Sequence, residues 1–279
     1  RIEVSMKRNR KILLKLIYIA MFSALSFIGT MIFIPFGASK IHLGNLVCLL
    51  AGLLCGGLIG GLSGSIGMGL NDIVMGYGPE TYLRTFILKF LMGFIVGLLF
   101  RVMLKKKANG FTFNLISSLA LTGLSGYLLY LYLIDTPKIT LWILVLSFAL
   151  AILFLVVSFL SKNLDPTMNC LSFSLVVAIG VNVIGEFFIR MLINTIIGMT
   201  SEEALATSLA KLPASLVTSL LTILLVLPLF YPLYHATKKF NAFNDLENVL
   251  SLSQMKGKEQ HETKQNTTRN DETESGLRK

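Results

Sequence analysis

Residues 43–75 read LGNLVCLLAGLLCGGLIGGLSGSIGMGLNDIVM, and the way in which this stretch is divided decides the fold. The stretch is almost wholly apolar and rich in glycine. It is therefore either one long membrane helix or two short ones that meet at residues 58–59. Two helices put the basic N-terminus and the basic residues after position 104 on the same side of a membrane, whereas one helix puts them on opposite sides.

The rest of the chain has the composition of a membrane protein. Of its 279 residues, 54% are hydrophobic and 14% are charged, and the mean hydropathy is +0.72. A soluble domain has about 25% charged residues, so this chain has too few polar residues to cover a water-facing surface. The composition excludes an ordinary soluble enzyme, a disordered protein and a nucleic-acid-binding domain. It predicts an all-α, polytopic transmembrane helical bundle.

The distribution of charge predicts the topology. Eight apolar runs are separated by charged, proline or glycine breaks: residues 12–34, 43–58, 59–75, 84–104, 113–134, 140–161, 171–198 and 212–236. With eight spans, thirteen Lys and Arg residues flank the membrane on one side, and only Lys40, Arg84, Lys138 and Lys211 flank it on the other. Cytoplasmic flanks carry the excess of basic residues. We therefore expect eight spans, with both termini in the cytoplasm.

The two ends of the chain differ in composition: the N-terminal region is basic and then apolar, and the C-terminal region is polar. Residues 6–34 resemble a signal peptide, but the apolar run has the roughly 20 residues of a spanning helix, which favours a retained first span. Met6 is a possible start residue. Residues 241–279 are rich in Asn, Glu, Lys, Thr and Gln, and we expect a disordered cytoplasmic tail. The three scattered cysteines indicate neither disulfides nor a metal site, and no cofactor is expected.

Small residues recur at intervals of four in two places. Gly52, Gly56, Gly60 and Gly64 predict close packing of the second and third spans, because small residues let membrane helices approach each other. They do not form a Walker A phosphate loop, because no Lys follows them at the required spacing. Residues Ala20 and Ala24 make a second smooth patch, on the first span.

Ionisable residues within the spans point to a cavity. Asn182, Glu186, Arg190 and Asn194 follow one another at intervals of four, so they form one polar stripe on an apolar helix. Charge in hydrocarbon costs about 2.5–3.5 kcal/mol on insertion scales, so the stripe must face protein or water. Glu186 and Arg190 either neutralise each other or contact a solute. Other polar residues gather at the outer ends of the spans, namely His42, Asn45, Asp72, Tyr77, Tyr82 and Arg84, and favour an outward-opening pocket for a small solute.

Catalysis has little support in the sequence. His42, His235 and His261 belong to no HExxH motif, and no nucleophile–base set is visible. The pair Glu202–Glu203 superficially resembles the paired glutamates of intramembrane proteases, but the Arg that should follow is missing. We do not expect an enzyme, and a membrane enzyme is the weakest alternative.

Several motifs together resemble a known family. Residues 41–46 read IHLGNL, residues 49–54 read LLAGLL and residues 60–67 read GGLSGSIG; Asp72, Gly76–Tyr77, Lys89 and Gly93 follow them. This pattern resembles the substrate-binding S components of energy-coupling factor (ECF) vitamin transporters, in the riboflavin/pyridoxine-type branch. The resemblance covers about residues 10–104 and 171–237. Asn45 stands where the family pattern HLGD has an acid.

The resemblance implies a domain organisation and a set of partners. Family members have six spans, so residues 1–104 and 166–240 are expected to form the two parts of an S-component core. Residues 105–165 are then an inserted helical pair, and residues 241–279 the tail. An S component in a bacterial cell membrane binds a vitamin-like solute and associates with a coupling membrane subunit and two ABC ATPase subunits. Ala20 and Ala24 match the patch by which S components dock onto the coupling subunit.

The expected binding residues come from the family resemblance and from the positions of polar residues in the predicted spans. Asp72 and Lys89 follow from the resemblance, Asn182, Glu186 and Arg190 from the polar stripe, and Asn45 and Tyr77 from their place at the outer side. The alternative function is a stand-alone secondary transporter, although no convincing internal repeat favours it.

Overall fold

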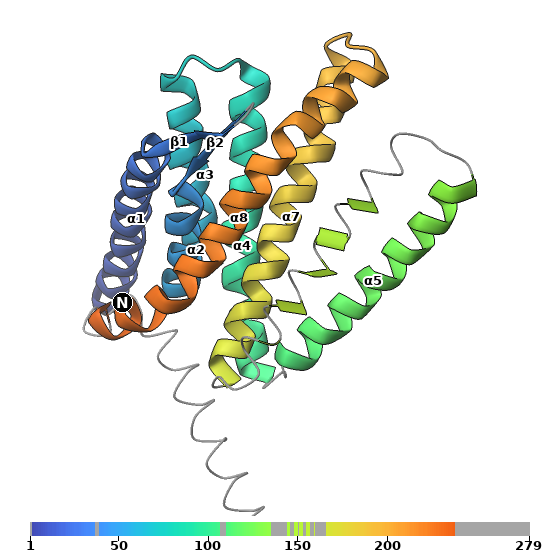
Figure 1. Ribbon diagram of the computed structural model, residues 1–279. Coiled ribbons are helices and arrows are strands. Elements are labelled where there is room, and N and C mark those ends of the chain that lie inside the picture. The colour runs from blue at the N-terminus through green and yellow to red at the C-terminus, as the bar shows by residue number, and fades with distance from the viewer. Residues whose placement is uncertain are drawn as a thin grey trace, which may run out of the picture.

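The protein is an all-α polytopic helical bundle with one short β-hairpin (Figure 1). The computed structural model describes residues 2–36, 39–106, 110–134 and 166–237, together with residues 144–145, 148–149, 151–152, 155–156 and 159. The elements are α1 (Ile2–Met31), β1 (Phe33–Phe36), β2 (Ser39–His42), α2 (Gly44–Cys55), α3 (Gly57–Val74), α4 (Pro79–Lys106), α5 (Gly110–Ile134), α7 (Pro166–Ile196) and α8 (Ser201–Thr237).

Four of the described helices are long and apolar enough to cross a membrane: Ile12–Met31, Pro79–Lys106, Thr167–Ile196 and Ser201–Ala236. Gly44–Cys55 is a shorter apolar helix. The predicted helical membrane fold is confirmed, whereas the number of eight spans stays a prediction. Most of the predicted span 140–161, and the whole tail 241–279, lie outside the described residues.

Residues 43–75 contain two helices, α2 and α3. The turn between α2 and α3 lies at Gly56, two residues before the predicted division, and Gly56 has a φ of 114° that favours glycine. Nη1 of Arg101, on α4, donates to the carbonyl of Gly52 at 3.0 Å, and Nη2 donates to that of Leu54 at 3.2 Å. The guanidinium therefore ties the end of α2 to α4, and the carbonyl of Gly52 also accepts the N–H of Gly56 at 3.1 Å.

Glycines bring the first helices of the bundle into close contact. α3 packs against α1, α2 and α4. A Cβ built on Gly60 would overlap the backbone of Gly52, and one built on Gly93 would lie 2.5 Å from the carbonyl carbon of Gly60. The sequence predicts this close packing for the second and third spans, and the structure extends it to α4.

The hairpin is a correction to the predicted first span. The run 12–34 was expected to be one helix, but α1 ends at Met31 and the chain continues into β1. Pro35 disfavours helical backbone at the residue before it, and the segment around it is rich in Ile and Phe, which suit a strand. β1 pairs with β2 antiparallel, with Phe33 opposite His42. Leu43 then donates its N–H to the carbonyl of Gly29 at 2.9 Å, which ties the end of the hairpin to α1.

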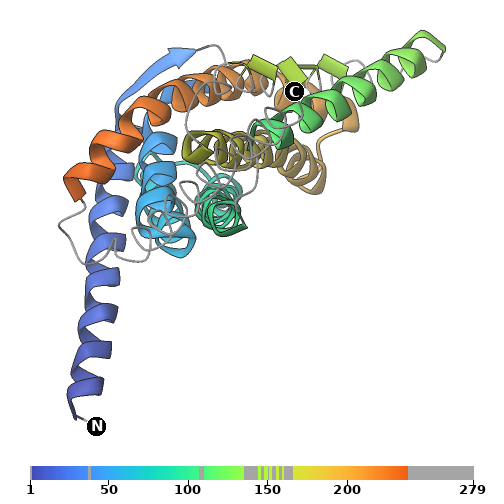
Figure 2. The same ribbon diagram turned by 90° about the horizontal axis from the view of Figure 1, so that it is seen from below.

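From α1 to α5, and again from α7 to α8, each helix runs opposite to the one before it (Figure 1), so the connections between these helices fall at two ends of the bundle. The hairpin, the α3–α4 turn and the α7–α8 turn lie toward one end, which we call the hairpin end (Figure 1). The N-terminus and the end of α8 lie toward the other end (Figure 1). α5 packs against α7 and lies at the edge of the bundle farthest from α1, as Figure 2 shows.

The apolar core occupies the centre of the bundle. It is built mainly from α2, α4, α7 and α8, where the ring of Phe100 meets that of Phe230 edge to face with centroids 5.4 Å apart. Other fully buried members are Leu49, Leu53, Met92, Val96, Leu171 and Leu175. Toward the hairpin end, this apolar packing gives way to polar and charged side chains.

Candidate functional site

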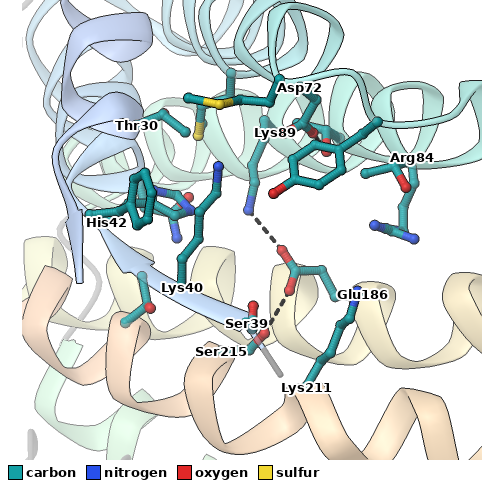
Figure 3. Close-up of a pocket in the computed structure, with 18 of the residues that line it drawn as sticks. Thr30, Ser39, Lys40, His42, Asp72, Arg84, Lys89, Glu186, Lys211 and Ser215 are labelled. Atoms are coloured by element: carbon teal, nitrogen blue, oxygen red, sulfur yellow. Dashed lines mark hydrogen bonds and ion pairs between the residues drawn. The ribbon is translucent and has the colours of Figure 1, made fainter. Parts of the chain in front are cut away.

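A cavity of about 460 Å³ lies toward the hairpin end of the bundle. Residues from α1, both strands, α2, α3, α4, α7 and α8 line it, so the chain closes around it from nearly every described element (Figure 3). Binding pockets for small molecules and cofactors have volumes of about 300–1,000 Å³. The cavity is therefore large enough for a solute of vitamin size.

The structure brings all seven of the expected binding residues to this cavity. They come from four helices and the α3–α4 turn, and all of them line the cavity: Asn45, Asp72, Tyr77, Lys89, Asn182, Glu186 and Arg190. Contact of these residues with a solute stays a prediction. Two other polar residues, one from the expected outer cluster and one from the polar stripe, do not line the cavity. Tyr82 is one, and the other is Asn194, whose amide donates to Oγ1 of Thr207 at 2.8 Å.

A buried ion pair crosses the floor of the cavity between α4 and α7. Nζ of Lys89 lies 2.9 Å from Oε1 of Glu186 and donates to Oδ1 of Asn182 at 2.8 Å. The hydroxyl of Ser215, on α8, donates to Oε2 of Glu186 at 2.7 Å (Figure 3). Glu186 thus forms its ion pair with Lys89, and not with Arg190 as one interpretation of the sequence had it.

Asp72 shapes the wall of the cavity at the end of α3. Its Oδ2 accepts a hydrogen bond from Oγ1 of Thr85 at 2.5 Å, and its carbonyl accepts one from the N–H of Tyr77 at 3.0 Å. Between them, Gly76 has a φ of 74°, which lets the chain turn back from α3 toward α4. The turn places the Tyr77 ring at the cavity.

Lys40 and His42 bring the hairpin to the cavity. Nζ of Lys40 lies 5.3 Å from the ring centroid of Phe33 and 5.4 Å from that of Tyr77, and donates to Oδ1 of Asn71 at 3.4 Å. Nδ1 of His42 accepts the N–H of Gly44 at 3.2 Å. Burial, with smaller contributions from nearby positive charges, lowers the pKa of His42 to about 3, so this ring is neutral at physiological pH.

Two buried polar atoms at the cavity have no hydrogen-bond partner within the described part of the chain. They are Oδ1 of Asn45 and Oγ1 of Thr218. A buried polar atom left without a partner costs about 1–3 kcal/mol. Both atoms belong to residues that line the cavity.

Sequence reasoning missed several lining residues, including Lys40, Lys211, Ser215 and Thr218. Lys40 lies on the hairpin, which was not expected. The count of basic residues on the outer flank nonetheless pointed to Lys40 and Lys211. Lys40, Arg84 and Lys211 are three of the four basic residues assigned to the outer flank, and all three line the cavity.

The residues considered for docking or catalysis, Ala20, Ala24 and Glu203, lie away from the cavity. Ala20 and Ala24 are exposed on α1. Glu203 closes the start of α8, because its carboxylate accepts the N–H and the hydroxyl of Thr200 at 3.0 and 2.9 Å. This is a capping box, which gives Glu203 a structural role. Within the described residues, no group of three or more His, Cys, Asp or Glu side chains could hold a metal ion.

Comparison with known proteins gives one match. The family model described as ECF-type riboflavin transporter, S component, matches residues 11–160, which is more than half of the chain. The matched range includes α1 from residue 11 onward, the hairpin, α2 to α5 and most of the segment 105–165, and it ends before α7. No curated protein and no solved structure matches the chain significantly.

Proposed function

The chain belongs to the family of ECF-type riboflavin transporter S components, and from this premise we propose which kind of solute it binds and how it delivers it. It is a multi-pass membrane protein and a substrate-binding component of an ECF transporter. In our proposal, it binds a vitamin or vitamin-like molecule in the cavity from outside a bacterial cell. It then hands the solute to a coupling membrane subunit driven by two ABC ATPase subunits, and itself catalyses no reaction.

The observation that carries the proposal is the cavity itself. Seven residues chosen from the sequence converge on one space of about 460 Å³, within a chain of a solute-binding family. The buried polar atoms of Asn45 and Thr218 that have no partner in the described part of the chain support a solute with hydrogen-bonding groups.

Two features support the proposed orientation and docking. The cavity lies toward the hairpin end, whereas Lys105 and Lys106 are exposed where α4 finishes, at the other end. Basic flanks favour the cytoplasm, so the cavity would open outward. Ala20 and Ala24 lie on the exposed side of α1, where small side chains allow close approach of a partner helix.

The test of the assembly is purification of the tagged full chain from its native membranes. We expect the coupling subunit and both ATPase subunits to co-purify, and mass spectrometry to find a small molecule released from the protein. Uptake by the chain alone in liposomes, without ATP, would instead identify a stand-alone transporter. Chemical conversion of the bound molecule would identify an enzyme.

A matched pair of variants tests the cavity. Thr218→Val removes the unpartnered hydroxyl of a residue that lines the cavity, while Thr222→Val removes a hydroxyl one helical turn away that donates to the carbonyl of Thr218 at 2.6 Å. A neutral hydrogen bond contributes about 0.5–1.5 kcal/mol. We therefore expect Thr218→Val to weaken solute binding by about two- to tenfold, and Thr222→Val to leave it unchanged. Equal affinities in both variants would contradict the assignment of the cavity.

A further inference from the structure

We propose that the transported solute carries a negatively charged group, a phosphate or a carboxylate, and that Arg84, Arg190 and Lys211 receive it. The proposal rests on the proposed function, which places the solute in the cavity, and it adds the chemical class of that solute. The name of the matched family points to riboflavin, which is uncharged, so the proposal distinguishes this chain's solute from that molecule.

The cavity has an excess of positive charge. Among the described residues, two carboxylates line it, those of Asp72 and Glu186, against five cations, those of Lys40, Arg84, Lys89, Arg190 and Lys211. His42 is neutral at physiological pH and adds no charge. A solute that enters this space therefore meets a positive potential, which favours an anion.

The carboxylates already have partners. Glu186 is held by the ammonium of Lys89 and the hydroxyl of Ser215, and Asp72 by the hydroxyl of Thr85. By contrast, Arg84, Arg190 and Lys211 form no hydrogen bond or ion pair with any residue that the structure describes. The three unpaired cations are thus the groups of the cavity with free capacity to bind an anion.

The three cations lie at one level of the bundle. Arg84 precedes Lys89 by five residues on α4, Arg190 follows Glu186 by four on α7, and Lys211 precedes Ser215 by four on α8. Because α4 starts, α7 ends and α8 starts at the hairpin end, each step leads toward that end. At 1.5 Å per residue, the three side chains start about 6–8 Å above the Lys89–Glu186 pair. Three helices therefore contribute one cationic layer above the ion pair.

This arrangement is costly without a ligand. Arg84 is only 7% exposed, and Arg190 and Lys211 are each repelled by neighbouring cations more strongly than the carboxylate of Glu186 attracts them. A buried charge without a partner is strongly destabilising, whereas an arginine paired with a carboxylate or phosphate forms strong, directional hydrogen bonds. An anionic group bound between the three side chains would relieve both the burial and the repulsion.

The test uses the purified full chain and needs no variant in its first arm. Thermal unfolding is measured with sodium phosphate, sodium succinate and sodium chloride at equal ionic strength, and flavin fluorescence measures the affinities of riboflavin and riboflavin 5′-phosphate. We expect phosphate or succinate to raise the unfolding temperature above that in chloride. We also expect any flavin binding to be at least tenfold tighter for the phosphate ester, as a charged hydrogen bond implies.

The second arm assigns the residues. Arg84→Gln and Arg190→Gln should each lose the response to the anion, and Lys105→Gln, which removes an exposed cation at the far end of α4, should keep it. If Arg84→Gln or Arg190→Gln fails to fold, the salt and flavin measurements on the wild-type protein still decide whether the cavity binds an anion.

Three results would overturn the proposal. They are equal unfolding temperatures in all three salts, riboflavin binding as tightly as its phosphate, and stabilisation by phosphatidylglycerol in nanodiscs without any response to soluble anions. Failure of the proposed function is separate, since it would appear as absence of the coupling and ATPase subunits after purification, whichever anion binds.

Discussion

The ammonium of Lys89 lies 2.9 Å from the carboxylate of Glu186, although the two residues are 97 positions apart in the chain. Lys89 is on α4, inside the range that matches the family model, and Glu186 is on α7, beyond it. Only 5% of the Lys89 side chain and 22% of the Glu186 side chain are exposed. The pair thus joins the two parts of the bundle at the floor of the cavity, where water provides little screening.

Removing one member of this pair should be worse than removing both. Lys89→Met leaves the carboxylate of Glu186 without its counter-charge, and Glu186→Gln does the converse for Lys89. Loss of one partner of a buried pair costs about 3–5 kcal/mol, while replacement of both is often nearly neutral. We expect each single variant to unfold at a lower temperature than the double variant in detergent. A double variant less stable than either single one would contradict a mutual pair.

Because α3 and α4 touch at glycines, a methyl group should destabilise the protein at a glycine of this contact and be harmless at a glycine outside it. Gly93→Ala places a Cβ against the backbone of Gly60 and forces α3 and α4 apart. Gly180→Ala, on α7, is the matched control, because a Cβ there meets nothing within 4 Å and Ala is favoured over Gly in a helix by about 1 kcal/mol. Gly93→Ala should lower the unfolding temperature, and Gly180→Ala should leave it equal or higher. Equal effects would refute the close approach of α3 and α4.

The sequence predicted those parts of the fold that local patterns determine. Apolar runs, basic flanks and glycines at intervals of four are properties of neighbouring residues, so they indicated the helices and the turn near Gly56. The polar stripe on α7 was visible for the same reason, because residues four apart share a helix face. The hairpin was missed because the apolar residues 32–34 fit a helix as well as a strand, and only Pro35 marked the change.

The partners within the site could not be predicted, because they depend on packing between distant segments. Arg190, four residues from Glu186, was the nearest opposite charge in sequence, but α4 brings Lys89 closer. Lys211 looked like a flank charge of the last span until α8 proved to begin at Ser201, which places Lys211 one helical turn from Ser215 at the cavity. Such pairings follow from how the helices are arranged, which a single sequence does not contain.

His42 should make the protein less stable at mildly acidic pH. Its pKa of about 3 in the folded protein lies below the usual 6.5, so between these values the unfolded chain takes up a proton that the folded protein does not. Stability contributed by the neutral ring is therefore complete above pH 6.5 and falls as the pH is lowered toward 3. At pH 5 the loss is of the order of 2 kcal/mol. Unfolding temperatures at pH 8 and pH 5 should differ more for the wild type than for His42→Asn, and equal differences would refute the role of His42.

Substitutions in the exposed patch of Ala20 and Ala24 on α1 should abolish transport and leave solute binding unchanged. Ala20→Trp or Ala24→Trp adds a bulky ring to the exposed side of α1, away from the cavity lining, so solute affinity should stay unchanged. Close approach of a partner helix needs small side chains, so uptake in cells should be lost. Leu25→Trp is the control: Leu25 is 45% exposed and lies about 100° or more around the helix from both alanines, so uptake should persist. The measurements are solute binding to the purified protein and solute uptake in cells. Normal uptake in both Ala20→Trp and Ala24→Trp would show that this patch is not part of the docking surface.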